Sequence, residues 1–267
     1  MVFGPPFEIS GKATSLSVSS VPTNPIPSDA YPRNNSFTLF DGPQTHYVYV
    51  PSNYDATHST PTKMFLFLHG NGGDSSGDIW TVSPGGSQDW ISICPGGRGN
   101  SEGHSRGWNE DMPGGKTIVM DAIAYMKTRF NIDPGKVFIG GYSGGGDMAY
   151  YATFNHSNTF AGVIAENTNP WRDNPFGNSS AAAFAANASG WKFNVAHLYH
   201  TSDSTYPKAE TETALNTMVS NGYPVQRLEK AGAHFDANTN PDLVAWFPQW
   251  IQSVGWEGPG GRGTTDS

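Results

Sequence analysis

The stretch Asn131-Ile-Asp-Pro-Gly-Lys-Val-Phe-Ile-Gly-Gly-Tyr-Ser143-Gly-Gly-Gly-Asp-Met-Ala149 decides the fold of this chain. Its apolar run Val137–Gly140 is typical of a buried strand, and the segment from Asp147 to Ala152 is typical of the start of a helix. Between them, Gly141-Tyr-Ser143-Gly-Gly145 fits the sharp strand-to-helix turn that lifts a nucleophilic serine out of a sheet. The helix N-terminus would also favour a negative charge developing nearby. We therefore predict that Ser143 is a nucleophile.

The pattern Gly-x-Ser-x-Gly occurs several times in the chain, and its surroundings separate the match at Ser143 from the others. Gly73–Gly77 and Gly99–Gly103 lie in polar, glycine-rich stretches without apolar periodicity on either side. We interpret Ser75 and Ser101 as loop serines. The pattern alone is weak in a chain with 32 glycines, so the strand and helix around Ser143 carry the assignment.

Short apolar runs and helical patterns alternate on both sides of this turn. Continuous apolar runs are expected where both faces of a parallel sheet are covered. Apolar residues recur at helical spacing from Ile118 to Phe130 and from Ala214 to Met218, and a further helix is expected over Pro241–Val254. The alternation predicts an α/β fold, a mostly parallel doubly wound sheet with helices on both faces. The predicted strands are His46–Val50, Met64–Leu68, Trp90–Cys94, Val137–Gly140, Gly162–Ala165, Ala196–Tyr199 and Val225–Glu229.

The two ends of the chain differ in composition from this alternating region. We predict an extended, proline-rich N-terminal arm over residues 1–35, a single α/β domain over 36–255 and a flexible glycine-rich tail over 256–267. Long loops are expected over 70–89, 95–115 and 167–190, and such loops at one edge of a sheet commonly carry function.

A second strand leads into a candidate anion-binding loop. Met64–Leu68 runs directly into His69-Gly-Asn71, and a strand followed by His-Gly-x-Gly supplies a backbone N–H to the tetrahedral oxygen in hydrolases of this kind. The expected oxyanion hole combines the N–H of Gly144, which follows the nucleophile, with that of Asn71 or Gly70. His69 is expected to order the loop rather than to move protons.

Candidates for an acid and a base follow the nucleophile in the chain order Ser, acid, His. Asp203 comes shortly after the predicted strand Ala196–Tyr199, and His234 comes shortly after the strand Val225–Glu229. We predict that His234 accepts the serine proton and that Asp203 orients the imidazole. Glu166, which directly follows another strand, is the alternative acid.

These residues resemble the esterase family that contains poly(3-hydroxybutyrate) depolymerases, feruloyl esterases and acetyl xylan esterases. The likeness covers about residues 36–253 and is most specific over 131–149, where members show Asp-Pro-x-Arg-Val before the nucleophile and a Gly-Gly-x-Met-Ala-like helix after it. It implies an α/β-hydrolase fold for the domain over 36–255, hydrolysis of carboxylic esters, and no cofactor or metal. Lys136 replaces the more frequent arginine, and Asn71 stands where many depolymerase-like members have cysteine.

Aromatic residues near the predicted loop edge are candidates for substrate binding. We expect Tyr142, Trp108, Trp171 and Phe235 to line the site. The segment 169–190 is a candidate lid, since it inserts before the strand that carries the acid. Neutral aromatic loops suit a sugar or phenolic ester better than an anionic substrate.

Charge and cysteine content exclude several other classes of protein. Only 14% of the residues are charged and the net charge is −8, so no basic surface for nucleic acid is indicated. Apolar runs are too short for a membrane span. Cys94 is the only cysteine, which excludes an internal disulfide and a multi-cysteine metal site. We expect a secreted monomer, although the first residues show no signal peptide and a cytoplasmic location is the alternative.

Together these features predict a serine carboxylesterase that acts on feruloyl or acetyl esters of plant cell-wall polysaccharide. A polyester (polyhydroxyalkanoate-type) depolymerase is the neighbouring alternative. A peptidase fits less well, because peptidases of this fold usually carry an additional domain. An inactive binding module with the same fold is the alternative from another class.

Overall fold

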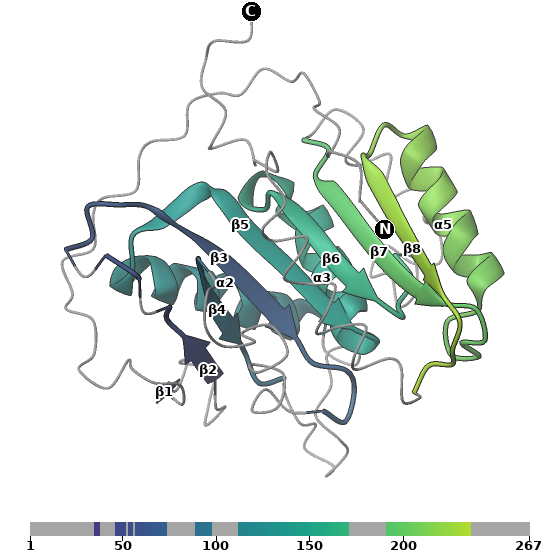
Figure 1. Ribbon diagram of the computed structural model, residues 1–267, viewed down its shortest axis with the longest axis horizontal. Coiled ribbons are helices and arrows are strands. Elements are labelled where there is room, and N and C mark those ends of the chain that lie inside the picture. The colour runs from purple at the N-terminus through teal and green to yellow at the C-terminus, as the bar shows by residue number, and fades with distance from the viewer. Residues whose placement is uncertain are drawn as a thin grey trace, which may run out of the picture.

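The computed structural model describes residues 35–37, 46–51, 53–55, 57–73, 89–97, 112–170 and 191–235. They form one twisted sheet of eight strands in the order β1-β2-β4-β3-β5-β6-β7-β8 (Figure 1). Strands β3 to β8 run parallel to one another, whereas β2 pairs antiparallel with both β1 and β4. The strands are β1 (Asn35–Phe37), β2 (His46–Tyr49), β3 (Thr62–Leu68), β4 (Trp90–Cys94), β5 (Ile132–Tyr142), β6 (Gly162–Glu166), β7 (Asn194–His200) and β8 (Val225–Lys230).

The central strands are apolar on both faces, which explains their unbroken apolar sequence. In β3, Met64, Leu66 and Leu68 join one hydrophobic cluster. Phe65 and Phe67, which point to the other face, join a second cluster. A strand buried on both sides is expected in a parallel sheet whose connections cover it.

Three described α-helices contribute to the first of these clusters. They are α2 (Met112–Arg129), α3 (Gly144–Asn155) and α5 (Lys208–Ser220), and a short 3-10 helix, η2 (Ser157–Thr159), follows α3. Ala122 of α2, Met148 of α3 and Leu215 of α5 are fully buried in that cluster. Among the helices in the described ranges, none combines the length and apolarity needed to cross a membrane.

The predicted α/β-hydrolase fold is confirmed, and each of the seven predicted strands is present. One strand was not predicted: β1, a three-residue strand that pairs with β2. The loop expected over 95–115 was wrong at its end, because α2 already begins at Met112. Pro113 is tolerated in a first helical turn, but the two glycines after it are weak helix formers and conceal the start of the helix.

Several predicted segments lie outside the described residues. They are the arm up to residue 34, the tail over 256–267, the helix over Pro241–Val254 and most of the candidate lid, over 171–190. These assignments remain predictions.

The parallel arrangement brings the predicted catalytic and oxyanion-hole residues to one edge of the sheet. Each follows the carboxyl end of a strand, β3, β5, β7 or β8, and the carboxyl ends of parallel strands share an edge. The figure shows β6 and β7 side by side between β5 and β8, so β5 and β8 are not neighbours in the sheet (Figure 1). The base on β8 must therefore reach across two strands to meet the nucleophile on β5.

Candidate active site

Ser143 occupies the sharp turn between β5 and α3 that the sequence predicts. Its backbone has φ 53° and ψ −127°, a conformation that residues other than glycine rarely adopt. The amide of Ser143 donates to the carbonyl of Glu166 at 3.0 Å, and the amide of Asp147 donates to the carbonyl of Ser143 at 3.1 Å. Strained residues of this kind persist where the surroundings fix them, and they are common at functional sites.

The two glycines that flank this turn are required by close packing of the backbone. A Cβ atom at position 141 would lie 2.4 Å from the carbonyl carbon of Gly145. One at position 145 would lie 2.0 Å from the carbonyl oxygen of Leu68, on strand β3. Both glycines of the Gly-x-Ser-x-Gly pattern are therefore needed so that the start of α3 can pack closely against the end of β5 and against β3.

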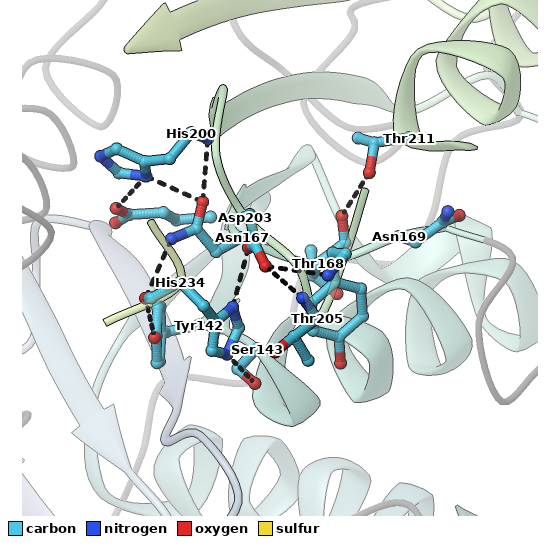
Figure 2. Close-up of polar contacts among 12 residues, drawn as sticks. Tyr142, Ser143, Asn167, Thr168, Asn169, His200, Asp203, Thr205, Thr211 and His234 are labelled. Carbon is cyan, nitrogen blue, oxygen red and sulfur yellow. Dashed lines mark hydrogen bonds and ion pairs between the residues drawn. The ribbon is translucent and has the colours of Figure 1, made fainter. Parts of the chain in front are cut away.

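Ser143, His234 and Asp203 lie in a hydrogen-bonded row (Figure 2). The Oγ of Ser143 is 3.0 Å from Nε2 of His234, and Nδ1 of His234 is 2.8 Å from Oδ2 of Asp203. The carboxylate of Asp203 can only accept a hydrogen bond, so Nδ1 of His234 carries the hydrogen of the neutral imidazole and donates it. Nε2 then has a free lone pair and can accept from the hydroxyl of Ser143. All three residues are buried. This is the arrangement that activates a serine for nucleophilic attack.

Asp203 is held by the turn in which it stands. Its Oδ1 accepts from the amides of Thr205 and Tyr206, at 2.8 and 2.9 Å, which leaves Oδ2 for the imidazole. These bonds fix the carboxylate without a contribution from the base.

The alternative acid, Glu166, faces a different histidine. Its Oε1 lies 3.7 Å from Nδ1 of His200, and both side chains are fully buried. The Nδ1 of His200 also lies 2.8 Å from Oδ1 of Asn167. The two candidate acids therefore contact different histidines: Asp203 binds His234, and Glu166 lies beside His200.

Two donors from other strands hold the backbone of the base. The hydroxyl of Tyr142, on β5, donates to the carbonyl oxygen of His234, and Nδ2 of Asn167, after β6, donates to the same oxygen at 3.3 Å. The side-chain amide of Asn167 has one possible orientation. Its oxygen, Oδ1, must face the backbone N–H of His200, from which it accepts at 3.1 Å, so Nδ2 faces His234. Asn167 was not predicted from the sequence, and the available signal was an asparagine, a residue type that tolerates the positive φ of 45° seen here, directly after a strand.

The predicted oxyanion loop lies against the start of α3. A Cβ atom at position 144 would be 2.4 Å from Oδ1 of Asn71, so this side chain packs directly on Gly144. His69 is buried, and its two ring nitrogens contact the backbone of two loops, the carbonyl of Gly70 at 2.8 Å and the amide of Gly97 at 2.9 Å. These contacts fit the predicted ordering role of His69.

Two of the four candidate substrate-binding residues lie in the described part of the chain. Phe235 is 73% exposed, and its ring meets the imidazole of His234 edge-on, with 4.7 Å between the centroids. Tyr142 is buried and stacks on the same imidazole at 5.3 Å, so its contacts are those of a residue that holds the base. Trp108 and Trp171 lie outside the described residues.

A second buried histidine lies on β7, outside this row. Burial lowers the pKa of His197 to about 3, and the nearby positive charge of Arg227 acts in the same direction. The Nδ1 of His197 is 2.7 Å from the hydroxyl of Tyr150, whose pKa burial raises well above its ordinary value. Within the described ranges, no three or more His, Cys, Asp and Glu side chains are grouped so that they could hold a metal ion.

A family model matches more than half of this chain. The model of the prolyl oligopeptidase family matches residues 76–224, a range that includes Ser143 and Asp203 and ends before His234. A comparison with curated proteins found no match.

Many solved structures share the fold, and three illustrate their range. A ferulic acid esterase is 16% identical with a TM-score of 0.58, and the match covers 78% of this chain and 91% of that one. S-formylglutathione hydrolase from Staphylococcus aureus is 15% identical with a TM-score of 0.59, and the match covers 78% and 90% of the two chains. The acylaminoacyl peptidase of Pyrococcus horikoshii is 15% identical with a TM-score of 0.60, and the match covers 82% of this chain but only 40% of the peptidase.

Proposed function

The chain belongs to the prolyl oligopeptidase family of serine hydrolases, and we propose that it is a carboxylesterase that uses Ser143 as its nucleophile. The hydrogen-bonded row Ser143–His234–Asp203 is the observation that carries the proposal. Because these residues come from three separate loops, their contact depends on the whole fold.

Acylation follows from the positions of the two imidazole nitrogens. Nε2 of His234 takes the proton of the Ser143 hydroxyl while Oγ bonds to the ester carbonyl carbon. Asp203 stabilises the resulting imidazolium at Nδ1. The imidazolium then returns the proton to the leaving oxygen, so the C–O bond breaks, the alcohol departs and the acyl group remains on Oγ.

Deacylation repeats these steps with water. Nε2 accepts a proton from water as the water oxygen attacks the acyl carbon, and the proton then returns to Oγ as the acid leaves. In both steps the carbonyl oxygen becomes negative. The amides of Gly144, at the N-terminus of α3, and of Asn71 or Gly70 are the proposed donors to it.

We propose feruloyl or acetyl esters of plant cell-wall polysaccharide as the substrates. The exposed ring of Phe235 beside the base supports an aromatic acyl group, because it offers a face or edge on which such a ring can pack. The low charge content of the chain supports a neutral substrate. The ferulic acid esterase with the same fold is compatible with this substrate class.

A peptidase is the second candidate, because the family takes its name from a peptidase and the Pyrococcus peptidase shares the fold. This chain spans 40% of the length of that enzyme, so the comparison is limited to one part of it. A polyester depolymerase would use the same acyl-enzyme chemistry. An inactive binding module would keep the geometry without turnover.

The test is a substrate panel with Ser143→Ala and His234→Ala beside the wild type. The panel contains p-nitrophenyl acetate, methyl ferulate, acetylated xylan, a polyester film and acylated peptide anilides. We expect ester turnover by the wild type and a loss of at least about 10⁴-fold in both variants. Ser220→Ala, which changes an exposed serine at the end of α5, is the matched control and should stay active.

The outcomes separate the candidates. Turnover of peptide anilides but not esters would overturn the proposal in favour of a peptidase, and clearing of the film alone would favour a depolymerase. Folded wild type that neither turns over the panel nor reacts with a fluorophosphonate would show that the serine is not activated.

A further inference from the structure

A buried carboxylate outside the catalytic row joins three segments of the site. Asp147 lies in the first turn of α3 and is 2% exposed. Its Oδ2 accepts from the hydroxyl of Tyr206 at 2.5 Å, and its Oδ1 accepts from the hydroxyl of Thr168 and from the amide of Asn169 at 3.4 Å. Hydrogen bonds to a buried charged group are among the stronger ones in proteins, so this carboxylate is a firm anchor.

Tyr206, which binds this anchor, also contacts both the acid and the base. Its amide donates to Oδ1 of Asp203 at 2.9 Å. Its ring lies against the imidazole of His234, with 5.5 Å between the centroids and 32° between the planes. Tyr206 is 4% exposed, so its hydroxyl, its ring and its backbone amide make these three contacts in the interior of the protein.

Asp147 is connected to the nucleophile as directly as Tyr206 is to the acid. The amide of Asp147 donates to the carbonyl of Ser143 at 3.1 Å, as part of the first turn of the helix. One hydrogen bond between side chains 59 positions apart therefore links the turn that carries the nucleophile to the turn that carries the acid.

We propose that Asp147 and Tyr206 form a positioning pair, which keeps the Asp203 turn and the imidazole aligned with Ser143 during catalysis. The proposal rests on the proposed function, since it assigns a role in the same reaction. A shift of about 1 Å in a catalytic group can lower a rate a hundredfold, so a contact that prevents such shifts affects kcat without touching the substrate.

A purely structural role would have a different kinetic signature. Loss of a structural contact lowers the fraction of folded enzyme, and this fraction can be counted by titration with a fluorophosphonate. Loss of a positioning contact lowers kcat for each titrated site and leaves KM unchanged, because substrate binding does not involve the pair.

The experiment compares Tyr206→Phe, Asp147→Asn and the double variant with the wild type, using the best ester of the panel. Tyr206→Phe keeps the ring against His234 and removes only the hydroxyl. We expect each single variant to lower kcat per titrated site about tenfold, with KM within about twofold of wild type. The double variant should be about as slow as Asp147→Asn alone, because Tyr206→Phe removes a hydrogen bond that loss of the Asp147 charge has already weakened.

Tyr199→Phe is the matched control. The hydroxyl of Tyr199 contacts Glu212 at 3.0 Å and Glu229 at 3.4 Å, neither of which belongs to the row Ser143–His234–Asp203, and its removal should leave kcat per site unchanged.

Three results would overturn the pair: an unchanged kcat per site in Tyr206→Phe, losses that multiply in the double variant, or an equal loss in Tyr199→Phe. If Asp147→Asn does not fold, Tyr206→Phe and its control decide the question alone. Wild type that hydrolyses no ester and takes up no fluorophosphonate refutes the proposed function instead.

Discussion

His197 makes the stability of this protein depend on pH. The side chain is fully buried in β7, and its pKa is about 3, compared with an ordinary value of 6.5. Between these two values the unfolded chain binds a proton that the native protein does not bind. The free energy of unfolding therefore falls as the pH falls through this window, and it does not change with His197 above pH 6.5.

The size of the effect follows from the shift. Each pH unit below the ordinary value costs about 1.4 kcal/mol, so the native state loses about 2 kcal/mol between pH 7.5 and pH 5 because of this one side chain. Any native pKa below about 4 gives nearly the same loss at pH 5. His197→Asn removes the titrating group and keeps a polar partner for the hydroxyl of Tyr150, which lies 2.7 Å from Nδ1.

The assay is urea unfolding at several pH values from 7.5 to 5, followed by circular dichroism. His197→Asn is expected to be less stable than wild type at pH 7.5, because the smaller side chain packs less well, yet to lose about 2 kcal/mol less on going to pH 5. Tyr150→Phe keeps the histidine and should retain the pH dependence of wild type. Equal pH dependence in wild type and His197→Asn would refute the reasoning.

Three further predictions concern the site. Asp203→Asn should lower kcat by about 10³–10⁴-fold, because the imidazole of His234 loses its charged partner. Glu166→Gln should lower kcat less than about tenfold, because the carboxylate of Glu166 faces His200. Steady-state kinetics on one ester measures both variants. Gly145→Ala should abolish fluorophosphonate labelling, because the new Cβ would come 2.0 Å from a carbonyl oxygen of β3. Phe235→Ala should raise KM for methyl ferulate about fivefold and leave KM for acetylated xylan unchanged, since an acetyl ester has no aromatic ring to pack on Phe235.

Each of these predictions has a result that contradicts it. Equal losses in Asp203→Asn and Glu166→Gln would mean that the acid assignment is wrong. Full labelling of Gly145→Ala would mean that the backbone at the turn can move. A parallel rise of KM for both esters in Phe235→Ala would show that the ring has no preference for aromatic acyl groups.

The strands were predictable from sequence because burial on both faces leaves a continuous apolar run. Strand β4 was predicted with its observed bounds, Trp90–Cys94, and all five of its residues are buried. β5 was predicted as Val137–Gly140 but begins at Ile132, where Asp133, Pro134 and Gly135 give no apolar signal. The pairing of Ile132 with Thr62 of β3 extends the strand, and such a partner is visible only in three dimensions.

The candidate triad could be predicted because each of its members follows a strand in a fixed chain order. The residues that hold the triad in place could not be predicted from the sequence. Asn167, Asp147 and Tyr206 act through contacts with residues 21 to 67 positions away or through backbone groups, and no spacing in the sequence marks such contacts. Tyr142 was predicted as a substrate contact because it is an aromatic residue at the predicted loop edge, but its hydroxyl and its ring both contact His234.

The base is the member of the row that most needs such support. His234 follows β8, the last strand of the described sheet, which pairs with β7 alone among the strands described. Edge strands have a neighbour on one side only, so the loop after β8 receives little guidance from the sheet itself. The donors to the carbonyl of His234 come instead from the ends of β5 and β6, and its ring is flanked by Tyr142 and Tyr206. The alignment of an edge loop with a nucleophile beyond two intervening strands is therefore fixed by the interior of the sheet, and a change at those interior positions should affect catalysis without altering a catalytic residue.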